Sequence, residues 1–341
     1  MKYFSPFVST FIFLMSFTLL TIEGLAQSNT NGSLLVSTDR YEFYSNFWIN
    51  MHHFLYKKAE QANEKSWQEV FEDEILNQMN NNEREILSHS IQYYQDHLTE
   101  KSLLFDDQLY WTKRALIKFG ANDVLDHESI NSEHQQVLNN AKSVYANYFW
   151  KVHHNQNRKT LDKYLPLVKK IENRTFNRIE SLAKEPWPEE KIRVDLSYYS
   201  NWAGAYTTTT PIHVVLTSLE EGSDGEWAEY GWLELLFHEP SHGVITNNKL
   251  PVADTIKSIS EELDVKVPRD LWHAVLFYFS GKAVQEALRD EGIEYELMMI
   301  TYDIFSRYHA VVFEHMPPYV RGNEGLETAL RKAIIDWYDL N

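Results

Sequence analysis

Apolar side chains recur every three or four residues through the first half of the chain, which is the spacing of a buried helix face. Glycine is nearly absent from this stretch, and charged residues are spread between the apolar positions. The clearest runs are Tyr41, Phe43, Tyr44, Phe47, Trp48, Met51, Phe54 and Leu55, followed by Leu161, Tyr164, Leu165, Val168 and Ile171. The pattern predicts a mostly helical region from Asp39 to Lys184.

The pattern changes at the Pro186-Trp187-Pro188 run, because proline is excluded from helix interiors and restricts the residue before it. Residues 191–199 alternate apolar with polar side chains, which predicts a half-buried strand. Residues 211–218 are short and β-branched, which predicts a second strand. Between them, residues 201–210 are expected to form a turn and an extended segment.

Helical spacing returns in the last third of the chain. We expect helices over residues 226–246, 252–263, 270–289 and 326–338. The predicted fold class is therefore α+β, predominantly helical, with a small sheet.

The first residues have the pattern of an export signal. Lys2 precedes an apolar stretch over residues 7–22, and Gly24-Leu25-Ala26 is a small-x-small cleavage pattern. We expect residues 1–26 to be a signal peptide and the chain to be an exported bacterial protein, periplasmic or secreted. The alternative is an uncleaved anchor helix. No later stretch is apolar for long enough to insert stably into a membrane once the signal is removed.

Charge and cysteine content narrow the chemistry. Lys and Arg total 32 against 49 Asp and Glu, a net charge of −17, which gives no electrostatic basis for binding nucleic acid. The chain has no cysteine, so disulfides and thiolate ligands are excluded. A metal site would have to use His, Asp or Glu.

One motif carries candidate chemistry, His238-Glu239-Pro240-Ser241-His242, which has the form HExxH. Residues four apart lie on one face of a helix, so both imidazoles can bind one Zn²⁺ at about 2.0–2.1 Å. Glu239 can then act as general base toward water activated by the ion. Pro240 removes the helix bond to the Leu236 carbonyl, so we expect a kink or a late first turn.

A metal site at His238 and His242 would also need a hydrogen-bond acceptor for the second ring nitrogen of a ligating histidine and a third ligand. Glu234 lies one turn before His238 and is expected either to accept its second ring N–H or to face solvent. For the third metal ligand the sequence favours His273 in an aromatic helix, and leaves open Glu261 or Glu262 and Glu286.

The chain resembles the zincin superfamily of zinc metallopeptidases. The strings WAGAYTTTTPIHVVLTS, LLFHEPSH and DLWHAVLFYFSG together resemble a group of exported bacterial proteins, and FDDQLYWTKRAL extends the resemblance into the helical half. The helical spacing and its end at the proline run predict a helical N-terminal region over residues 27–188, and the resemblance implies a zincin-like catalytic region over residues 189–341. The sequence leaves open whether these are one domain or two. The resemblance also implies that an edge strand within Tyr206–Ser218 lies along the substrate; the alternative is an ordinary core strand.

Several further residues have weaker signals. Donors to a developing oxyanion could come from Tyr302, His309 and His315, although a structural role is favoured for each. The adjacent pairs His52-His53 and His153-His154 cannot chelate one ion, because neighbours on a helix diverge. We interpret these pairs as surface or packing residues.

The sequence therefore predicts a zinc-dependent hydrolase, most simply a metallopeptidase acting on a peptide or protein substrate. Its ligands would be His238, His242 and His273, and Glu239 would be its base. Two alternatives stay open: a non-catalytic zincin-fold binding or structural protein with a structural metal, and a metal-dependent amidase.

Overall fold

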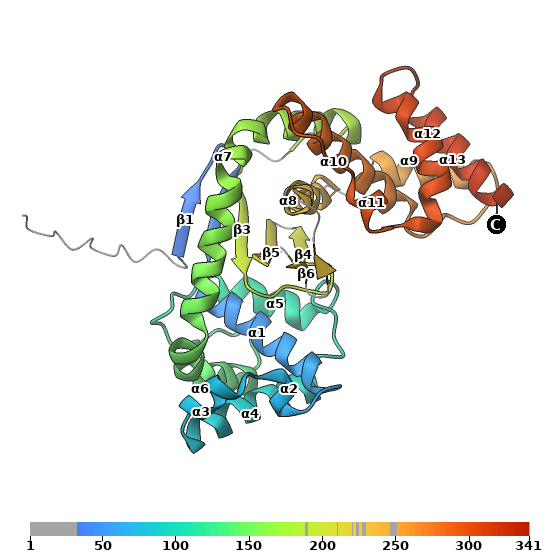
Figure 1. Cartoon of the computed structure of the whole chain (residues 1–341). Helices are drawn as coiled ribbons and strands as arrows, with labels where there is room; N and C mark the ends of the chain where they lie inside the picture. Colours follow the sequence, from blue (N-terminus) through green and yellow to red (C-terminus); the bar gives the residue numbers. More distant parts are fainter. Residues whose placement is uncertain are drawn as a thin grey trace, which may run out of the picture.

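A computed structural model describes most of the chain (Figure 1). The described residues are 33–187, 190–209, 211–219, 221–222, 225–226, 230–245 and 251–340. The predicted signal peptide over residues 1–26 lies outside them. Within the described ranges, no helix combines the length and the apolar character that a membrane span requires.

The centre of the molecule is a mixed five-stranded sheet with the order β1-β2-β3-β5-β4. Strands β2, β3 and β5 are parallel, while β1 and β4 pair antiparallel to their neighbours at the two edges. The strands are β1 (Ser33–Ser37), β2 (Tyr41–Ser45), β3 (Ile192–Ser197), β4 (Ala205–Thr209) and β5 (Ile212–Thr217). The two strands predicted after residue 190 are confirmed as β3 and β5, and the predicted extended segment contains β4.

The helical prediction was wrong for residues 41–45, which form strand β2. Tyr41, Phe43 and Ser45 are buried while Glu42 and Tyr44 are partly exposed, so the burial alternates with period two. A run of five residues with three aromatic rings fits both the helical and the strand period, and pairing with β3 decided between them. The sheet therefore takes strands from both sides of residue 188.

Helices lie on both faces of the sheet (Figure 1), and each face packs against its own hydrophobic core. Ile212, Val214 and Val194 belong to the core on one face, and Tyr206 and Val215 belong to the core on the other. The first core is built mainly with α7 (Trp150–Ala183), α8 (Gly231–Ser241) and α10 (Leu271–Asp290). The second is built mainly with α1 (Phe47–Ala62), α4 (Asn81–His97) and α6 (Ser132–Tyr148).

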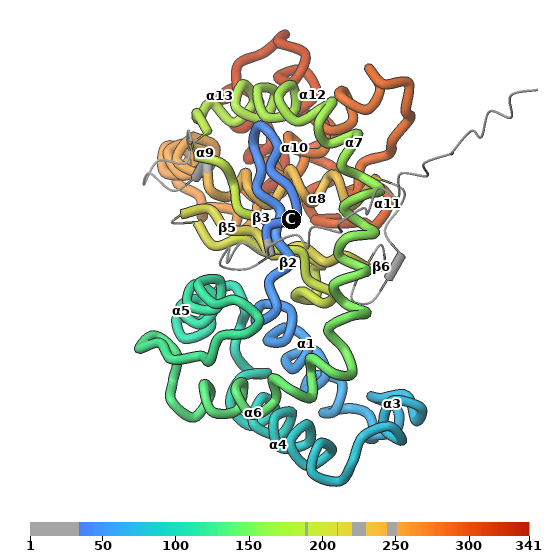
Figure 2. The backbone as a smooth tube through the Cα atoms, turned by 90° about the vertical axis from the view of Figure 1, so that its left-hand side faces the viewer, coloured from blue at the N-terminus to red at the C-terminus, as the bar shows by residue number. Residues whose placement is uncertain are grey.

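Helix α7 is long enough to join the two ends of the molecule, as Figure 2 shows. The remaining helices are α2 (Trp67–Val70), α3 (Asp73–Gln78), α5 (Asp107–Leu116), α9 (Pro251–Glu262), α11 (Met298–Thr301), α12 (His309–Val320) and α13 (Leu326–Leu340), with 3-10 turns η1 (His242–Ile245) and η2 (Ser306–Tyr308). A two-stranded ribbon is formed by β6 (Glu221–Gly222) and β7 (Gly225–Glu226). The predicted helices over 252–263, 270–289 and 326–338 are confirmed as α9, α10 and α13.

The motif helix is shorter than predicted and tightens at its end. Helix α8 runs through Pro240 and passes into the 3-10 turn η1 at His242. Pro240 has no N–H, so the Leu236 carbonyl lacks the partner that a helix normally supplies. The Tyr41 hydroxyl on β2 donates to this carbonyl at 3.0 Å in a fully buried position. The sheet thus satisfies the backbone group that the proline leaves open.

We predict that Tyr41→Phe lowers the free energy of unfolding by about 1–3 kcal/mol, because it leaves the Leu236 carbonyl buried without a donor. In a Pro240→Ala background the residue 240 N–H can bond this carbonyl, so the same change should be less destabilising. Urea denaturation of the two single variants and the double variant measures the coupling. Equal losses in both backgrounds would contradict this account.

Candidate metal centre

Three histidines from two helices converge in the first core. His238 lies on α8, His242 begins η1, and His273 lies on α10. The His238 Nε2 atom is 3.0 Å from His242 Nε2 and 3.2 Å from His273 Nε2. A tetrahedral ion with ligands at about 2.0–2.1 Å separates them by roughly 3.3–3.4 Å. This buried cluster could hold a metal ion, and the predicted third ligand His273 is part of it.

Burial keeps these imidazoles neutral. It lowers the pKa of His238 and His242 well below the ordinary value, and neighbouring rings of the cluster lower both further. It also lowers the pKa of His273 to about 4, although Asp270 opposes the shift. A neutral imidazole has one nitrogen with a free lone pair, which is the form that binds a metal. The cluster is therefore ready to bind a cation at neutral pH without first losing protons.

Ser280 on α10 contacts one nitrogen of His238 and leaves the other nitrogen facing the two remaining histidines. The Ser280 hydroxyl is within donating distance of the Leu276 and Phe277 carbonyls, at 2.9 and 3.1 Å. Its oxygen lies 3.2 Å from His238 Nδ1. Because the single hydroxyl proton goes to a carbonyl, the oxygen accepts from Nδ1–H. This leaves the lone pair on Nε2, the atom that faces the other two rings.

Both expectations for Glu234, a bond from His238 and a position facing solvent, were wrong. The Glu234 carboxylate is fully buried and accepts from the Tyr295 hydroxyl at 2.6 Å and from the Met298 N–H at 3.1 Å. It lies against α10, where a Cβ at Gly281 would come within 2.7 Å of Oε1. Glu234 therefore joins α8 to the segment after α10, and Ser280 takes the role predicted for it.

Glu239 lies beside the cluster in a site that favours its protonated form. It is 7% exposed, and burial raises the pKa of its carboxyl to about 7, although Thr207 and Lys113 oppose the shift. The Thr207 hydroxyl on strand β4 lies 2.9 Å from the Glu239 Oε2 atom and 2.9 Å from its backbone carbonyl. The edge strand β4 thus contacts the acid of the motif directly.

The other candidate ligands are engaged elsewhere. Each glutamate left open by the sequence pairs with a basic side chain, as Lys257–Glu261, Arg331–Glu262 and Arg178–Glu286. Among the described residues, only the three histidines form a group able to hold a metal ion.

The candidate oxyanion donors and the adjacent histidine pairs contact other parts of the fold. The His309 ring lies 2.8 Å from the Ile304 carbonyl, and the His315 ring lies 2.6 Å from Asp336. Tyr302 packs against the first core. In the adjacent pairs, His52, His53 and His153 are buried and bond tyrosine hydroxyls. The packing interpretation of the pairs is confirmed for these three, and the surface interpretation was wrong for them.

Two residues of the site were missed by sequence reasoning, Ser280 and Thr207. Ser280 lies seven residues after His273, which places both on one face of α10, so helical spacing could have found it. Thr207 belongs to a run of four threonines, and only the sheet shows which of them faces α8.

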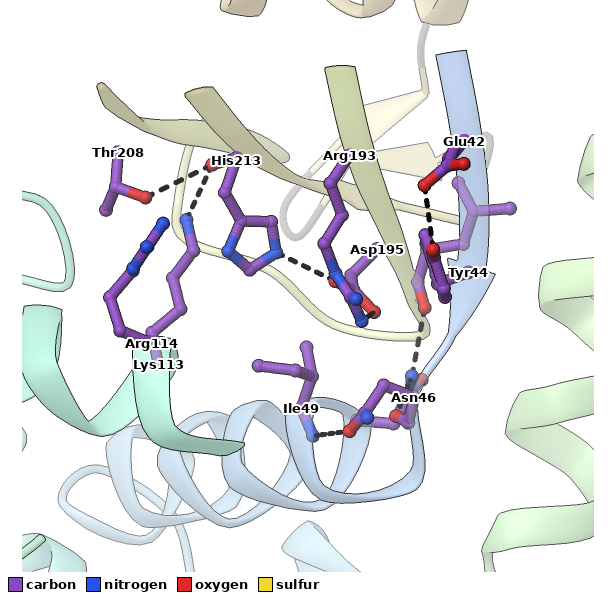
Figure 3. A network of polar contacts seen from close by, with 12 residues as sticks. Glu42, Tyr44, Asn46, Ile49, Lys113, Arg114, Arg193, Asp195, Thr208 and His213 are labelled. Atoms are coloured by element: carbon purple, nitrogen blue, oxygen red, sulfur yellow. Dashed lines mark hydrogen bonds and ion pairs between the residues drawn. The ribbon is translucent and has the colours of Figure 1, made fainter. Parts of the chain in front are cut away.

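The opposite face of the sheet carries a separate polar network (Figure 3). Lys113 on α5 donates to the His213 carbonyl at 2.9 Å, and the His213 ring lies 2.8 Å from Asp195. Burial alone would raise the pKa of Asp195, but Arg193 and His213 outweigh it and hold that pKa well below its ordinary value. Burial lowers the pKa of Lys113 to about 7. These groups stabilise β3 and β5 beneath the edge strand.

We predict that Ser280→Ala weakens binding of Zn²⁺ about tenfold or more, because the His238 Nδ1–H loses its acceptor and the ring its orientation. Competition with a chromophoric chelator measures the dissociation constant. Ser260→Ala is a matched control, since Ser260 is also buried in a helix and donates to a carbonyl four residues earlier. Equal affinities of the two variants would contradict the assigned role.

We also predict that Glu234→Gln changes how stability depends on pH. Burial raises the folded-state pKa of Glu234 to about 7 from an ordinary 4.5. The fold therefore favours the protonated form, and stability is full below about pH 4.5 and declines as the pH rises through 7, by about 3 kcal/mol. The glutamine oxygen can still accept from Tyr295 and Met298, but it carries no charge, so the part of the decline that Glu234 contributes should disappear. The part from Glu239, whose pKa burial also raises to about 7, should remain.

Urea denaturation at pH 5 and pH 8 measures the effect of Glu234→Gln. The exposed Glu261→Gln is the control and should retain the parent's difference between the two pH values. An unchanged difference in Glu234→Gln would mean that its carboxyl does not contribute to the decline.

Comparisons with protein-family models, with curated proteins and with solved structures find no match to this chain.

Proposed function

We propose that this protein is a zinc-dependent hydrolase with a zincin-like catalytic region. The observation that carries the proposal is the convergence of three imidazole Nε2 atoms next to the buried acid Glu239. Neutral nitrogen ligands at near-tetrahedral separations suit Zn²⁺ among the common biological cations. The order of parts, an HExxH helix beneath an edge strand with a third ligand on a later helix, agrees with the resemblance to zincins.

The number of ligands favours catalysis over a structural metal. Structural zinc sites are closed by four protein ligands, whereas catalytic sites use three and keep one position open. The described residues supply three. His238 is 2% exposed, but His242 and His273 are partly exposed, so one side of the cluster is accessible. A substrate could approach from that side.

Glu239 is suited to take a proton and return it. When Glu239 is ionised, the Thr207 hydroxyl can donate to Oε2. When Glu239 is protonated, Oε2–H can donate to the Thr207 oxygen, and the threonine proton can go to the Glu239 backbone carbonyl. Thr207 can therefore hydrogen-bond Glu239 in both its ionised and its protonated state. A residue that acts first as general base and then as general acid passes through both states. Bound Zn²⁺ would supply the remaining chemistry by activating water and polarising the carbonyl.

The edge strand supports a peptide substrate. Strand β4 pairs with β5 on one side and is the last strand of the sheet on the other. An extended peptide can add to such an edge through main-chain hydrogen bonds. Because Thr207 on this strand bonds Glu239, the added peptide would lie next to the base. We therefore propose a metallopeptidase that acts on peptides or proteins, and the signal-peptide prediction would place it outside the cytoplasm.

We predict that Glu239→Gln abolishes hydrolysis of a peptide library, with a loss on the order of 10²–10⁴-fold, because the amide cannot accept the proton. It should leave one Zn²⁺ per chain, since the three imidazoles are unchanged. Mass spectrometry of the digests and metal analysis of the purified variant measure both quantities. Glu261→Gln, on the surface of α9, should retain full activity.

Three results of this experiment would speak against the proposal. A Glu239→Gln variant as active as the parent would remove the assigned base. Stoichiometric zinc without cleavage of any peptide by the parent would favour the non-catalytic protein with a structural metal. Cleavage of non-peptide amides alone would favour the amidase.

A further inference from the structure

A cavity of about 400 Å³ lies in the second core, on the face of the sheet away from the histidine cluster. Its walls come from α1, from the residues around α2, from the end of α6 and the start of α7, and from the residues after β3. Aromatic rings line it together with charged, polar and aliphatic side chains, and the phenylalanine and tyrosine rings are Phe54, Phe71, Tyr148, Phe149, Tyr198 and Tyr199. This volume is within the range of small-molecule sites, about 300–1,000 Å³.

Lys58 is the cationic group of this cavity. Its ammonium donates to the Val70 carbonyl at 2.8 Å and to Gln61 Oε1 at 3.2 Å, and it lies 5.1 Å from the centre of the Phe71 ring. Among the described residues no carboxylate lies within ion-pair distance of it. Burial lowers the pKa of Lys58 to about 8, although the nearby Glu72 opposes the shift, so Lys58 remains mostly charged at neutral pH. A partly buried charge with one donor to spare favours an anionic ligand.

His153 is the second polar group of the lining. It is 4% exposed, its Nδ1 lies 2.8 Å from the Tyr145 hydroxyl, and its ring stacks on Tyr198 at 4.2 Å. The described residues offer no hydrogen-bond partner to its Nε2 atom. If Tyr145 donates to Nδ1, the neutral ring has an N–H at Nε2 that a ligand oxygen can accept.

Two exposed acids, Glu69 and Glu72, also line the cavity and limit the charge of a ligand. Glu69 accepts from the Ser66 N–H at 2.8 Å, which keeps it in place. The two carboxylates repel a negatively charged ligand in the cavity, and the repulsion grows with the ligand's charge. Ligands with several negative charges, such as nucleotides, are therefore disfavoured.

We propose that this cavity binds a small aromatic molecule with a single negative charge, an aryl carboxylate. Its ring would pack between the aromatic walls, and its carboxylate would accept from the Lys58 ammonium. The site is separate from the histidine cluster, so binding should persist when metal is removed by a chelator. The inference does not depend on the proposed hydrolase activity.

Calorimetry of the full chain with three probes of similar shape tests the charge requirement. Indole-3-acetate is an anion, indole-3-acetamide is neutral and tryptamine is a cation. We expect one indole-3-acetate per chain, with the other two bound roughly tenfold or more weakly. Equal affinities for the anion and the amide, or no binding of the anion at millimolar concentration, would overturn the proposal.

Variants of Lys58 test the assigned group. Lys58→Met should weaken indole-3-acetate binding roughly tenfold or more, and Lys58→Arg should restore most of it. Lys142→Met is the matched control, because Lys142 also donates to a backbone carbonyl and lies over a ring, that of Trp48, but outside the cavity. Unchanged binding by Lys58→Met, or an equal loss in Lys142→Met, would refute the role.

A second pair of variants covers the case in which Lys58→Met does not fold. Val152 lines the cavity and is exposed, so Val152→Trp should block the site without disturbing the core. Val124→Trp, at another exposed valine outside the lining, is its control. Indole-3-acetate binding should be lost in Val152→Trp and kept in Val124→Trp, and retention in both would place the ligand elsewhere.

Discussion

The structure around the candidate site depends on one arrangement, three neutral imidazoles in which the His238 Nε2 atom lies 3.0 Å from that of His242 and 3.2 Å from that of His273. Burial disfavours protonation of these rings, so each neutral imidazole keeps one nitrogen with a free lone pair. The cluster could therefore hold a metal ion. Ser280 strengthens the arrangement because it fixes the tautomer of His238, the ring that contacts both others.

The central sheet brings the parts of this site together. Its order places β4 at an edge, next to α8, so that Thr207 reaches Glu239. Its second strand places Tyr41 under α8, where the hydroxyl satisfies the carbonyl left open by Pro240. A proline inside the motif helix is therefore compatible with the His238 to His242 spacing, because the sheet compensates for the missing bond. Segments more than 150 residues apart in the chain meet in this way.

The two faces of the sheet have different chemistry. The face toward α8 and α10 holds the histidine cluster and its acid, while the other face holds the Lys113–His213–Asp195 network and, beyond it, the aromatic cavity around Lys58. In each case a titratable group is buried, and its charge depends on whether its partners outweigh the effect of burial on its pKa. Asp195 stays ionised beside Arg193, whereas Glu234 and Glu239 have no cation close enough to overcome burial.

The sequence by itself determined the α+β class, strands β3 and β5, helices α9, α10 and α13, and the HExxH pair, because each depends on spacing within one short segment. The sequence favoured His273 as the third metal ligand but could not exclude Glu261, Glu262 or Glu286, since the choice depends on which helix packs against α8. Strand β2 was predicted as helix, because a run of five residues is too short to distinguish the helical period of 3.6 from the strand period of two. Tertiary structure alone decided the partners of His238, Glu234 and Leu236. Those are contacts between distant segments, and the direction of a side chain across such a contact is set by packing and not by local pattern.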